Sequence, residues 1–197
     1  MKIYDISQEV FTCSVYPGDP SPQREEISSI KNGDLYNLTA FSMCAHNGTH
    51  IDAPYHFLRN GKTVEAMSIE KTVGYAFVFE VSGDICAADA RDIVQKAKSV
   101  NAEAAKRILL KGSLTVSNEA AREFVRAGVE LIGDESQTVG PEDSPAEVHK
   151  ILLGADLALL EGIRLQNVPE GVYLLCAAPI LLGGADGAPC RAILIEI

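Results

Sequence analysis

A histidine-rich segment, 46-HNGTHIDAPYHF-57, carries the residues best suited to chemistry. It holds three of the four histidines of the chain, together with an aspartate, within eleven residues. If this segment is extended, side chains two residues apart share a face, so that His46, His50 and Asp52 converge. Imidazoles and a carboxylate suit Zn²⁺, with Mn²⁺ and Fe²⁺ as competitors, and three ligands leave coordination positions open for catalysis. The segment therefore predicts a metal centre, with hydrogen-bonded histidines in a polar loop as the alternative.

Two further residues of the segment are expected to shape this centre. Gly48 falls between His46 and His50 on the shared face, where the absence of a side chain leaves room for an ion. Pro54 bars a regular strand beyond it, so the chain can turn and bring His56 back over the site. His56 is therefore predicted to lie at the centre without being an in-line ligand.

The fourth histidine, His149, and a carboxylate twelve residues later, Glu161, are the next candidates. His149 lies in a predicted helix among apolar neighbours, where a histidine packed in the core is an equally good interpretation. Glu161 ends the apolar run LALLE, and a carboxylate at the end of a buried strand needs a cation or a hydrogen-bond donor. A second metal held by His149 and Glu161 would account for both residues.

The elements that must position these residues alternate between apolar strands and helices in the second half of the chain, after a β-rich first half. Runs rich in Val, Ile and Leu are typical of strands covered on both faces. In the clearest helix, Ser144 is the predicted cap, Glu147 completes a capping box and Gly154 provides a left-handed stop. We therefore expect a single mixed α/β domain over residues 1–197. The predicted strands are KIYDIS, NLTAFSMCAH, GYAFVFEV, RILLK, VELIG, LALLE, VYLLCAAP and RAILIEI, and the predicted helices are 89–98, 117–127 and 144–153.

The composition excludes several classes of partner. The net charge of −10 disfavours nucleic acid and anionic membrane surfaces, because both require a basic surface. No apolar run approaches the ~20 residues of a membrane-spanning helix, and the N-terminal segment lacks the apolar core of a signal peptide, so we expect a cytoplasmic protein. The five cysteines are scattered without a C-x-x-C pair and are expected to be reduced and mostly buried.

These residues resemble the family of cyclase-like metal hydrolases, which includes bacterial kynurenine formamidase and isatin hydrolase. The resemblance rests on the motif H-x-G-T-H-x-D-x-P-x-H-F, which runs from His46 to Phe57, and on the pair His149 and Glu161. It continues in the opening IYDIS, in PGDP, in NVPEG and in the closing ADGAPCRAIL. It therefore covers nearly the whole chain.

The resemblance implies a fold, a metal content and a set of ligands. The fold would be a swivelling β/β/α domain, assembled into a homodimer or homotetramer. Two Zn²⁺ ions per chain are implied, with Mn²⁺ as the alternative. One metal would be held by His46, His50 and Asp52, and the other by Asp52, His149 and Glu161, with Asp52 and Glu161 bridging.

The chain departs from the family pattern at three positions. Formamidases that act on N-formylkynurenine carry a tryptophan before PGD, where this chain has Tyr16, which can still stack on an aromatic substrate but adds a hydroxyl group. Glu135 and Gly140 stand where the family tends to have aspartates, so contacts to the substrate or around the metal are expected to differ there.

The predicted function is metal-dependent hydrolysis of a small amide, either a formamide of the N-formylkynurenine type or a cyclic imide or lactam. His56, which the resemblance identifies as the general acid/base, would take a proton from water activated by the metal and return it to the leaving nitrogen. Two alternatives stay open. His50, Asp52 and His149 also fit the triad of a mononuclear non-haem Fe(II) oxygenase. A non-catalytic metal-binding protein would instead enclose its metal in a complete ligand set.

Overall fold

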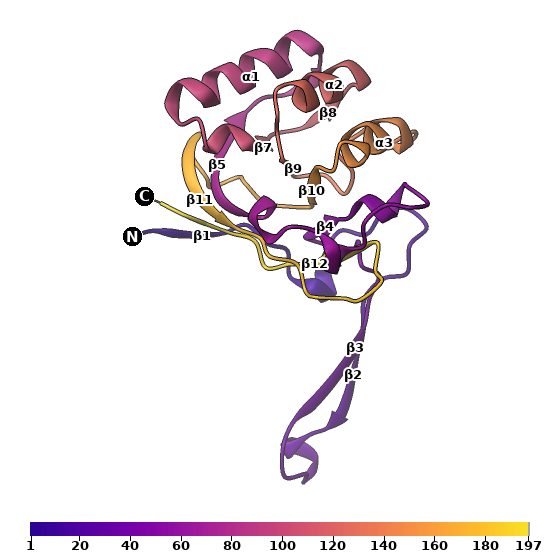
Figure 1. The fold of residues 1–197 in the computed structure, drawn as a ribbon. Helices are drawn as coiled ribbons and strands as arrows, with labels where there is room; N and C mark the ends of the chain where they lie inside the picture. The colour runs from indigo at the N-terminus through magenta and orange to yellow at the C-terminus, as the bar shows by residue number, and fades with distance from the viewer. Residues whose placement is uncertain (197) are drawn as a thin grey trace.

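The computed structural model describes residues 1–196, in which a curved sheet of nine strands carries three α-helices on one face (Figure 1). The inner strands β5, β7, β9 and β10 are parallel, and the strands that flank them on both sides join antiparallel. This arrangement confirms the predicted mixed α/β fold. The order across the sheet is β1 (Ile3–Asp5), β13 (Ile193–Ile195), β11 (Gly171–Cys176), β5 (Val73–Glu80), β7 (Arg107–Lys111), β9 (Leu131–Asp134), β10 (Ala158–Glu161), β4 (His50–Asp52) and β12 (Gly187–Pro189).

The helices follow parallel strands as crossover connections, which is why they gather on the same side of the sheet. They are α1 (Ala87–Val100), α2 (Asn118–Arg126) and α3 (Ala146–Gly154). Two short parallel strands, β6 (Gly83–Ile85) and β8 (Leu114–Val116), pair beside them. Single 3₁₀ turns occupy Val10–Thr12, Ile30–Asn32, Pro54–His56, Val64–Ala66, Ile69–Lys71 and Ala104–Lys106.

The predicted capping residues of α3 are wrong at both ends. Pro145 is the N-cap and already has helical dihedral angles, whereas the Ser144 hydroxyl bonds to the Asp143 side chain. At the other end Gly154 stays inside the helix, and Asp156 takes the left-handed conformation with a φ of 63°. Aspartate tolerates this conformation better than most residues, so a glycine is not needed there.

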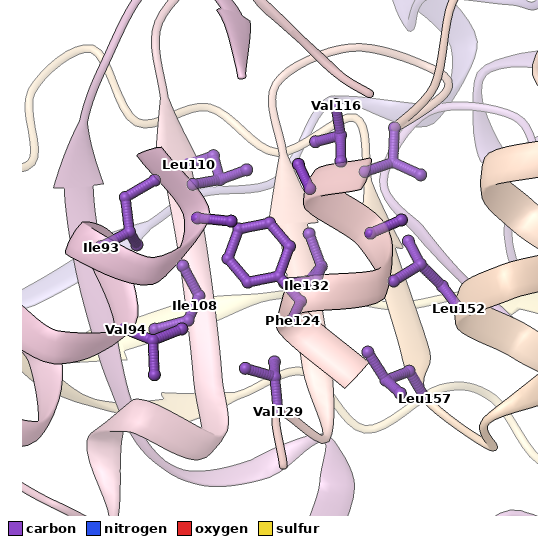
Figure 2. Close-up of a cluster of buried hydrophobic side chains, with 14 of the residues drawn as sticks. Ile93, Val94, Ile108, Leu110, Val116, Phe124, Val129, Ile132, Leu152 and Leu157 are labelled. Atoms are coloured by element: carbon purple, nitrogen blue, oxygen red, sulfur yellow. The ribbon is translucent and has the colours of Figure 1, made fainter. Parts of the chain in front are cut away.

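Apolar side chains fill both faces of the sheet. One cluster lies between the helices and the sheet, with Phe124 of α2 fully buried at its centre (Figure 2). Along β7 the faces alternate, because Ile108 and Leu110 belong to this cluster and Leu109 to the cluster on the opposite face. The expectation that the strands are covered on both faces is therefore confirmed for the parallel strands, which fix the position of the residues at their ends.

A two-stranded hairpin, β2 (Gln23–Ser28) and β3 (Leu38–Ser42), projects away from the main sheet (Figure 1). The segment NLTAFSMCAH was expected to run as a strand toward the histidine cluster. Instead its strand ends at Ser42, pairs with β2 alone and leaves the main sheet without a contribution from it.

The five cysteines are free thiols, but the expectation that most are buried is wrong: Cys86 is exposed, and the other four are half-buried. Most of them lie in loops and at strand ends rather than at central positions of the core. Within residues 1–196, no helix has both the length and the apolar character needed to cross a membrane.

Candidate metal centre

Two adjacent strands hold the carboxylates of the site. β10 and β4 pair antiparallel, with Glu161 opposite His50 and Leu159 opposite Asp52. Leu159 packs under the helices, so Glu161, two residues later, faces the helices as well. His50 and Asp52 flank Ile51, which packs on the opposite face. The register therefore gathers two carboxylates and an imidazole on the helix side of the sheet.

α3 supplies the imidazole that completes this group. His149 is buried on the face of α3 that meets the sheet. Its Nε2 atom lies 3.2 Å from Oε1 of Glu161 and 3.6 Å from Oδ2 of Asp52. The histidine therefore contacts carboxylates, so its apolar neighbours on the helix do not make it a simple core residue.

His46 reaches the site through a turn rather than along an extended strand. Only His50–Asp52 is a strand, and Gly48 has a φ of 68°, so the predicted extension from His46 to Asp52 is wrong. The left-handed backbone favours glycine, and a Cβ atom there would lie 2.9 Å from Cβ of Cys13. Gly48 thus allows its own segment to lie close to the segment that contains Cys13. The glycine was expected to leave room for an ion, and its observed role is this close approach instead. The turn still brings Nδ1 of His46 to 2.8 Å from Oδ1 of Asp52.

Backbone carbonyl groups orient two of the imidazoles. Nδ1 of His50 lies 3.0 Å from the carbonyl oxygen of Gly48, and Nδ1 of His149 lies 2.8 Å from that of Pro145. When each Nδ1–H donates to its carbonyl, the Nε2 atom is left as an acceptor that faces carboxylates. His50 Nε2 and Asp52 Oδ2 are buried, and no hydrogen-bond partner for either occurs in residues 1–196. Acceptors that face one another in a buried site need a cation between them.

The electrostatics of the site also favour a bound positive charge. Burial lowers the pKa of His50, but the carboxylates of Asp52 and Glu161 outweigh it and raise this pKa to about 10. Burial acts likewise on His149, whose pKa is raised to about 9 by Glu161 and Asp52. Burial alone would raise the pKa of Asp52, yet His46 and His50 hold it well below its usual range. The carboxylates therefore stay ionised and attract protons or metal cations to the space between the rings.

The five predicted ligands form two overlapping groups, and each group offers one nitrogen or oxygen atom per residue within 4.8 Å of the others. Histidine nitrogen and carboxylate oxygen are the ligand types that Zn²⁺ and Mn²⁺ share, so the residues present fit a divalent metal. Asp52 belongs to both groups. The groups are His46, His50 and Asp52, and Asp52, His149 and Glu161.

His56 lies beside the cluster, on the 3₁₀ turn that follows Pro54. Its ring stacks on that of His46, with 3.9 Å between the ring centroids. Burial lowers the pKa of His56 below its usual value of 6.5, so the ring is neutral at neutral pH and can accept a proton. The turn predicted after Pro54 therefore does bring His56 over the site.

Asp186 is a site residue that the sequence analysis missed. Its Oδ2 atom lies 2.9 Å from Nε2 of His46 and 3.1 Å from Nδ1 of His56, and the three side chains form a third group of potential ligands. Asp186 lies in the segment ADGAPC, directly before β12, and β12 pairs with β4. Its inclusion among the stretches that resemble the family was the signal that could have identified it.

A pocket of about 280 Å³ opens onto the cluster. The Tyr16 hydroxyl donates to the carbonyl oxygen of Glu142 at 2.8 Å, which fixes its ring at the pocket wall. The Phe57 ring lies against His149, with 4.6 Å between the centroids. An aromatic ring on each of two chain segments suits a small, flat substrate. Besides the histidines and Glu161, the pocket is lined by Tyr16, Asp19, Phe57, Gln137, Thr138 and Pro145.

The two other departures from the family pattern lie outside the pocket. Glu135 accepts hydrogen bonds from the backbone nitrogen atoms of Gly112 and Leu165, at 2.9 and 2.8 Å, and so ties neighbouring strand ends together. A Cβ atom on Gly140 would lie 3.1 Å from Cβ of Val148, so a larger residue there would press against α3. We expected these positions to change contacts with the substrate or around the metal. Neither residue lines the pocket, so the structure gives no support to that expectation.

Asp134, at the end of β9, is a second carboxyl group that the sequence analysis missed. It is buried, and desolvation together with the nearby charge of Glu161 raises its pKa well above the usual range. Its Oδ1 atom accepts a hydrogen bond from the backbone nitrogen of Ser136 at 2.9 Å. Burial and the neighbouring carboxylate therefore both oppose ionisation of Asp134 beside the cluster.

Comparisons with known proteins agree with this geometry. Residues 4–141 match the model of the Cyclase family. The kynurenine formamidase of Erythrobacter litoralis is 32% identical, over 100% of this chain and 94% of that protein. A solved structure described as a potential metal-dependent hydrolase with cyclase activity is 28% identical, with a TM-score of 0.80 over 98% of this chain and 96% of the other. Isatin hydrolase A from Labrenzia aggregata has the same fold, with a TM-score of 0.81 at 21% identity, over 100% of this chain and 94% of its own.

Proposed function

Because the chain belongs to the Cyclase family, we propose that it is a metal-dependent hydrolase of small, non-peptide amides. One observation carries the proposal: two potential ligand groups share Asp52, and the other four ligands line one pocket together with His56. The pocket, at about 280 Å³, suits a small molecule rather than a peptide segment. The names of the related kynurenine formamidases support the amide as the bond that is cleaved.

The metal content that fits this chain is two divalent ions, with Zn²⁺ as the first choice and Mn²⁺ as the second. We assign one ion to His46, His50 and Asp52, and the other to Asp52, His149 and Glu161. When bound there, such ions would supply Lewis acidity, which polarises a carbonyl group and lowers the pKa of bound water toward ~7. The buried acceptor atoms that lack hydrogen-bond partners support this assignment.

His56 is the group that we assign to proton transfer. When its Nδ1–H donates to Asp186, Nε2 is left free to accept a proton. Hydrolysis forms a C–O bond to the carbonyl carbon and breaks its C–N bond. Nε2 of His56 would accept the proton of the attacking water and deliver it to the leaving nitrogen, so that the products are a carboxylate and an amine. Asp186 would hold the ring in the orientation that this transfer needs.

The walls of the pocket favour a substrate with an aromatic ring next to the amide. Tyr16 and Phe57 can contact such a ring on its faces or edges, and Pro145 adds an apolar contact that excludes water. Arylformamides, including N-formylkynurenine, and fused cyclic imides or lactams meet this description. Tyr16 leaves both classes acceptable, since its hydroxyl group is already bonded to Glu142 and so does not remain unpaired against the substrate.

The oxygenase alternative is less favoured. A triad of His50, Asp52 and His149 would account for three members of the cluster. It would give no role to His46 and Glu161, although both contact members of that triad. A non-catalytic metal site is also less favoured, because it gives no reason for an open pocket over the cluster.

The experiment that tests this proposal is a hydrolysis assay with protein purified without chelators. Formanilide, N-formylkynurenine and isatin serve as substrates, and the released formate or ring-opened carboxylate is quantified. The proposal predicts turnover of at least one substrate under nitrogen, loss of turnover after dialysis against a chelator, and recovery with Zn²⁺ or Mn²⁺. Turnover that requires oxygen, or turnover that a chelator leaves unchanged, would overturn it.

A further inference from the structure

The side chain of Gln137 makes two hydrogen bonds to the backbone of one residue, Gly48. Its Oε1 atom accepts from the Gly48 nitrogen at 3.1 Å, and its Nε2 atom donates to the Gly48 carbonyl oxygen at 2.9 Å. Because a backbone nitrogen can only donate and a backbone oxygen can only accept, this pairing also fixes which way the amide group is turned. Gln137 thus pairs with Gly48 as a neighbouring strand would, although the two residues are 89 positions apart.

The Gly48 carbonyl group links this contact to the metal centre. Its oxygen atom is also the acceptor for Nδ1 of His50, at 3.0 Å. A carbonyl oxygen has two lone pairs, so it can receive the Gln137 amide and the His50 ring at the same time. A chain of hydrogen bonds therefore runs from Gln137 through Gly48 to an assigned metal ligand.

A second glycine lies tightly against this contact. Gly162, which directly follows Glu161, has a φ of 68°. A Cβ atom on Gly162 would lie 2.1 Å from Nε2 of Gln137 and 2.3 Å from the Gly48 carbonyl oxygen. The left-handed backbone and this close approach both require glycine at position 162. The Gln137 amide is therefore held between two segments that each carry an assigned ligand.

The backbone around Gln137 is anchored to the same cluster. The Ser136 hydroxyl group donates to the Thr138 carbonyl oxygen at 2.5 Å and accepts from the Thr138 nitrogen at 2.9 Å. The next backbone nitrogen, that of Val139, donates to Oε1 of Glu161 at 2.8 Å. Gln137 therefore extends from a segment whose position relative to the site is already fixed.

We propose that Gln137 is a positioning residue of the metal centre, which holds the Gly48 carbonyl group in the orientation that accepts Nδ1–H of His50. Nε2 of His50 then stays turned toward the carboxylates, 3.2 Å from Asp52 Oδ1 and 3.4 Å from Glu161 Oε2. A metal-binding imidazole keeps one tautomer and one orientation when its other nitrogen donates to a fixed acceptor, and loss of such an outer partner weakens metal binding by about 10–100-fold. This inference rests on the proposed metal content.

His149 is oriented without Gln137. Its Nδ1 atom lies 2.8 Å from the carbonyl oxygen of Pro145, which also accepts from the backbone nitrogen of His149 at 3.2 Å. The first turn of α3 therefore holds that carbonyl group in place. Loss of the Gln137 amide should accordingly affect the ion assigned to His46, His50 and Asp52 and spare the other.

The first test measures the affinity for each ion by competition between the protein and a chromophoric chelator for Zn²⁺. Gln137→Met keeps a side chain of similar length and removes the amide group. One of the two dissociation constants should rise by about 10–100-fold, and the other should change by less than about threefold. Gln8→Met is the matched control, because the Gln8 amide bonds to the Ser14 nitrogen and the Gly162 carbonyl oxygen, both at 2.7 Å. It should not reproduce the loss of one ion.

The results of this titration separate the inference from the proposed function. A wild type that binds two ions, with a Gln137→Met variant that binds both as tightly, would overturn the inference alone. An equal loss of both ions, or a loss as large in Gln8→Met, would also overturn it, since a general loosening of the fold would then be the cause. A wild type that binds no metal would overturn the proposed function as well.

A second measurement observes His50 directly. Nitrogen-resolved NMR of the Zn²⁺-loaded protein, labelled at its four histidines, follows the exchange of Nδ1 protons with solvent. In Gln137→Met the Nδ1 proton of His50 should exchange at least about tenfold faster than in the wild type, and that of His149 should keep its rate. Equal acceleration of both protons, or an unchanged His50 proton, would contradict a specific role of Gln137 in positioning His50.

The wild type alone provides a test that does not depend on how well a variant folds. One side-chain amide proton of Gln137 is bonded to Gly48, so it should exchange at least about tenfold more slowly than the amide protons of Gln166, which is exposed. Equal exchange rates for these two glutamines would contradict the hydrogen bond on which the inference depends.

Discussion

Nδ1 of His56 lies 3.1 Å from Oδ2 of Asp186, which is 130 residues further along the chain. β12 begins one residue after Asp186 and pairs with β4, so the pairing of two short strands brings these side chains together. The same carboxylate oxygen also lies 2.9 Å from Nε2 of His46. Asp186 therefore connects the proposed proton-transfer group to a proposed metal ligand.

Replacement of His56 by Asn should lower kcat by about 10²–10⁴ and leave the metal content unchanged, because the proposed role of the imidazole is to transfer a proton. Turnover is measured together with elemental analysis of the same sample. Asp186→Asn is the companion variant, and its effect should include a changed pH profile of kcat, since the carboxylate orients the His56 ring. Loss of metal from His56→Asn would show instead that His56 is a ligand.

Tyr16 should act through its ring rather than its hydroxyl group. Tyr16→Ala is expected to raise KM for an aryl amide by roughly tenfold, because aromatic contacts contribute ~0.5–1.5 kcal/mol beyond burial. Tyr16→Phe removes only the hydrogen bond to Glu142 and should raise KM less. Steady-state kinetics with formanilide and with an aliphatic formamide provide the comparison. Equal effects of both variants would place the role in the hydroxyl group.

The pH dependence of stability should include a contribution from Asp156. Burial raises the pKa of Asp156, but the ammonium groups of Lys62 and Lys71, at 2.7 and 2.6 Å, outweigh it and hold the pKa below its usual value. A carboxyl group with a lowered folded-state pKa stabilises the protein above its unfolded-state pKa, and this contribution is lost as the pH falls through the folded-state value.

Asp156→Asn should therefore cost ~0.2–1 kcal/mol at neutral pH, in the range of exposed ion pairs, and progressively less as the pH falls below the usual aspartate value of 3.8. Asparagine also tolerates the left-handed backbone at this position, so the variant tests the charge. Urea unfolding measures the difference, with Asp84→Asn, an exposed aspartate on β6, as the control. A difference that stays constant over this pH range would be inconsistent with the ion pairs.

Phe124 should be among the most sensitive positions of the core. Its ring is fully buried between α1, α3 and the sheet (Figure 2), so Phe124→Ala should destabilise the protein by ~3–5 kcal/mol. The neighbouring Val125 is only partly buried, and Val125→Ala should cost less. Urea unfolding of both variants decides the point, and equal losses would mean that the core is centred elsewhere.

The sequence was sufficient to predict the inner parallel strands of the main sheet, because these are apolar on both faces, as in LALLE, and leave few other structures available. It also identified five residues that the structure gathers at one cluster, since few arrangements besides a metal centre require imidazoles and carboxylates at such spacings. The end of β10 at Glu161 illustrates this, because a carboxylate there required a partner on the helix side.

Residues brought in by long-range pairing could not be predicted from local spacing. Asp186 reaches the site only because β12 pairs with β4, and no periodicity reveals that pairing. At Gly48 the chain turns and lies close to Cys13. The local spacing of the histidines, which predicted an extended segment, carries no information about this contact. β3 alternates like a core strand, yet it pairs only with β2, in a hairpin that lies apart from the main sheet.

The most direct test of the central claim is the metal content per chain of the wild type and of Glu161→Ala, measured by plasma mass spectrometry after purification without chelators. The claim is that the cluster of His46, His50, Asp52, His149 and Glu161 binds two divalent ions. It predicts about two equivalents in the wild type and a sharp fall in the variant, because His149 and Asp52 alone would hold the second ion weakly. A wild type without metal, or a variant that keeps its full content, would contradict the account.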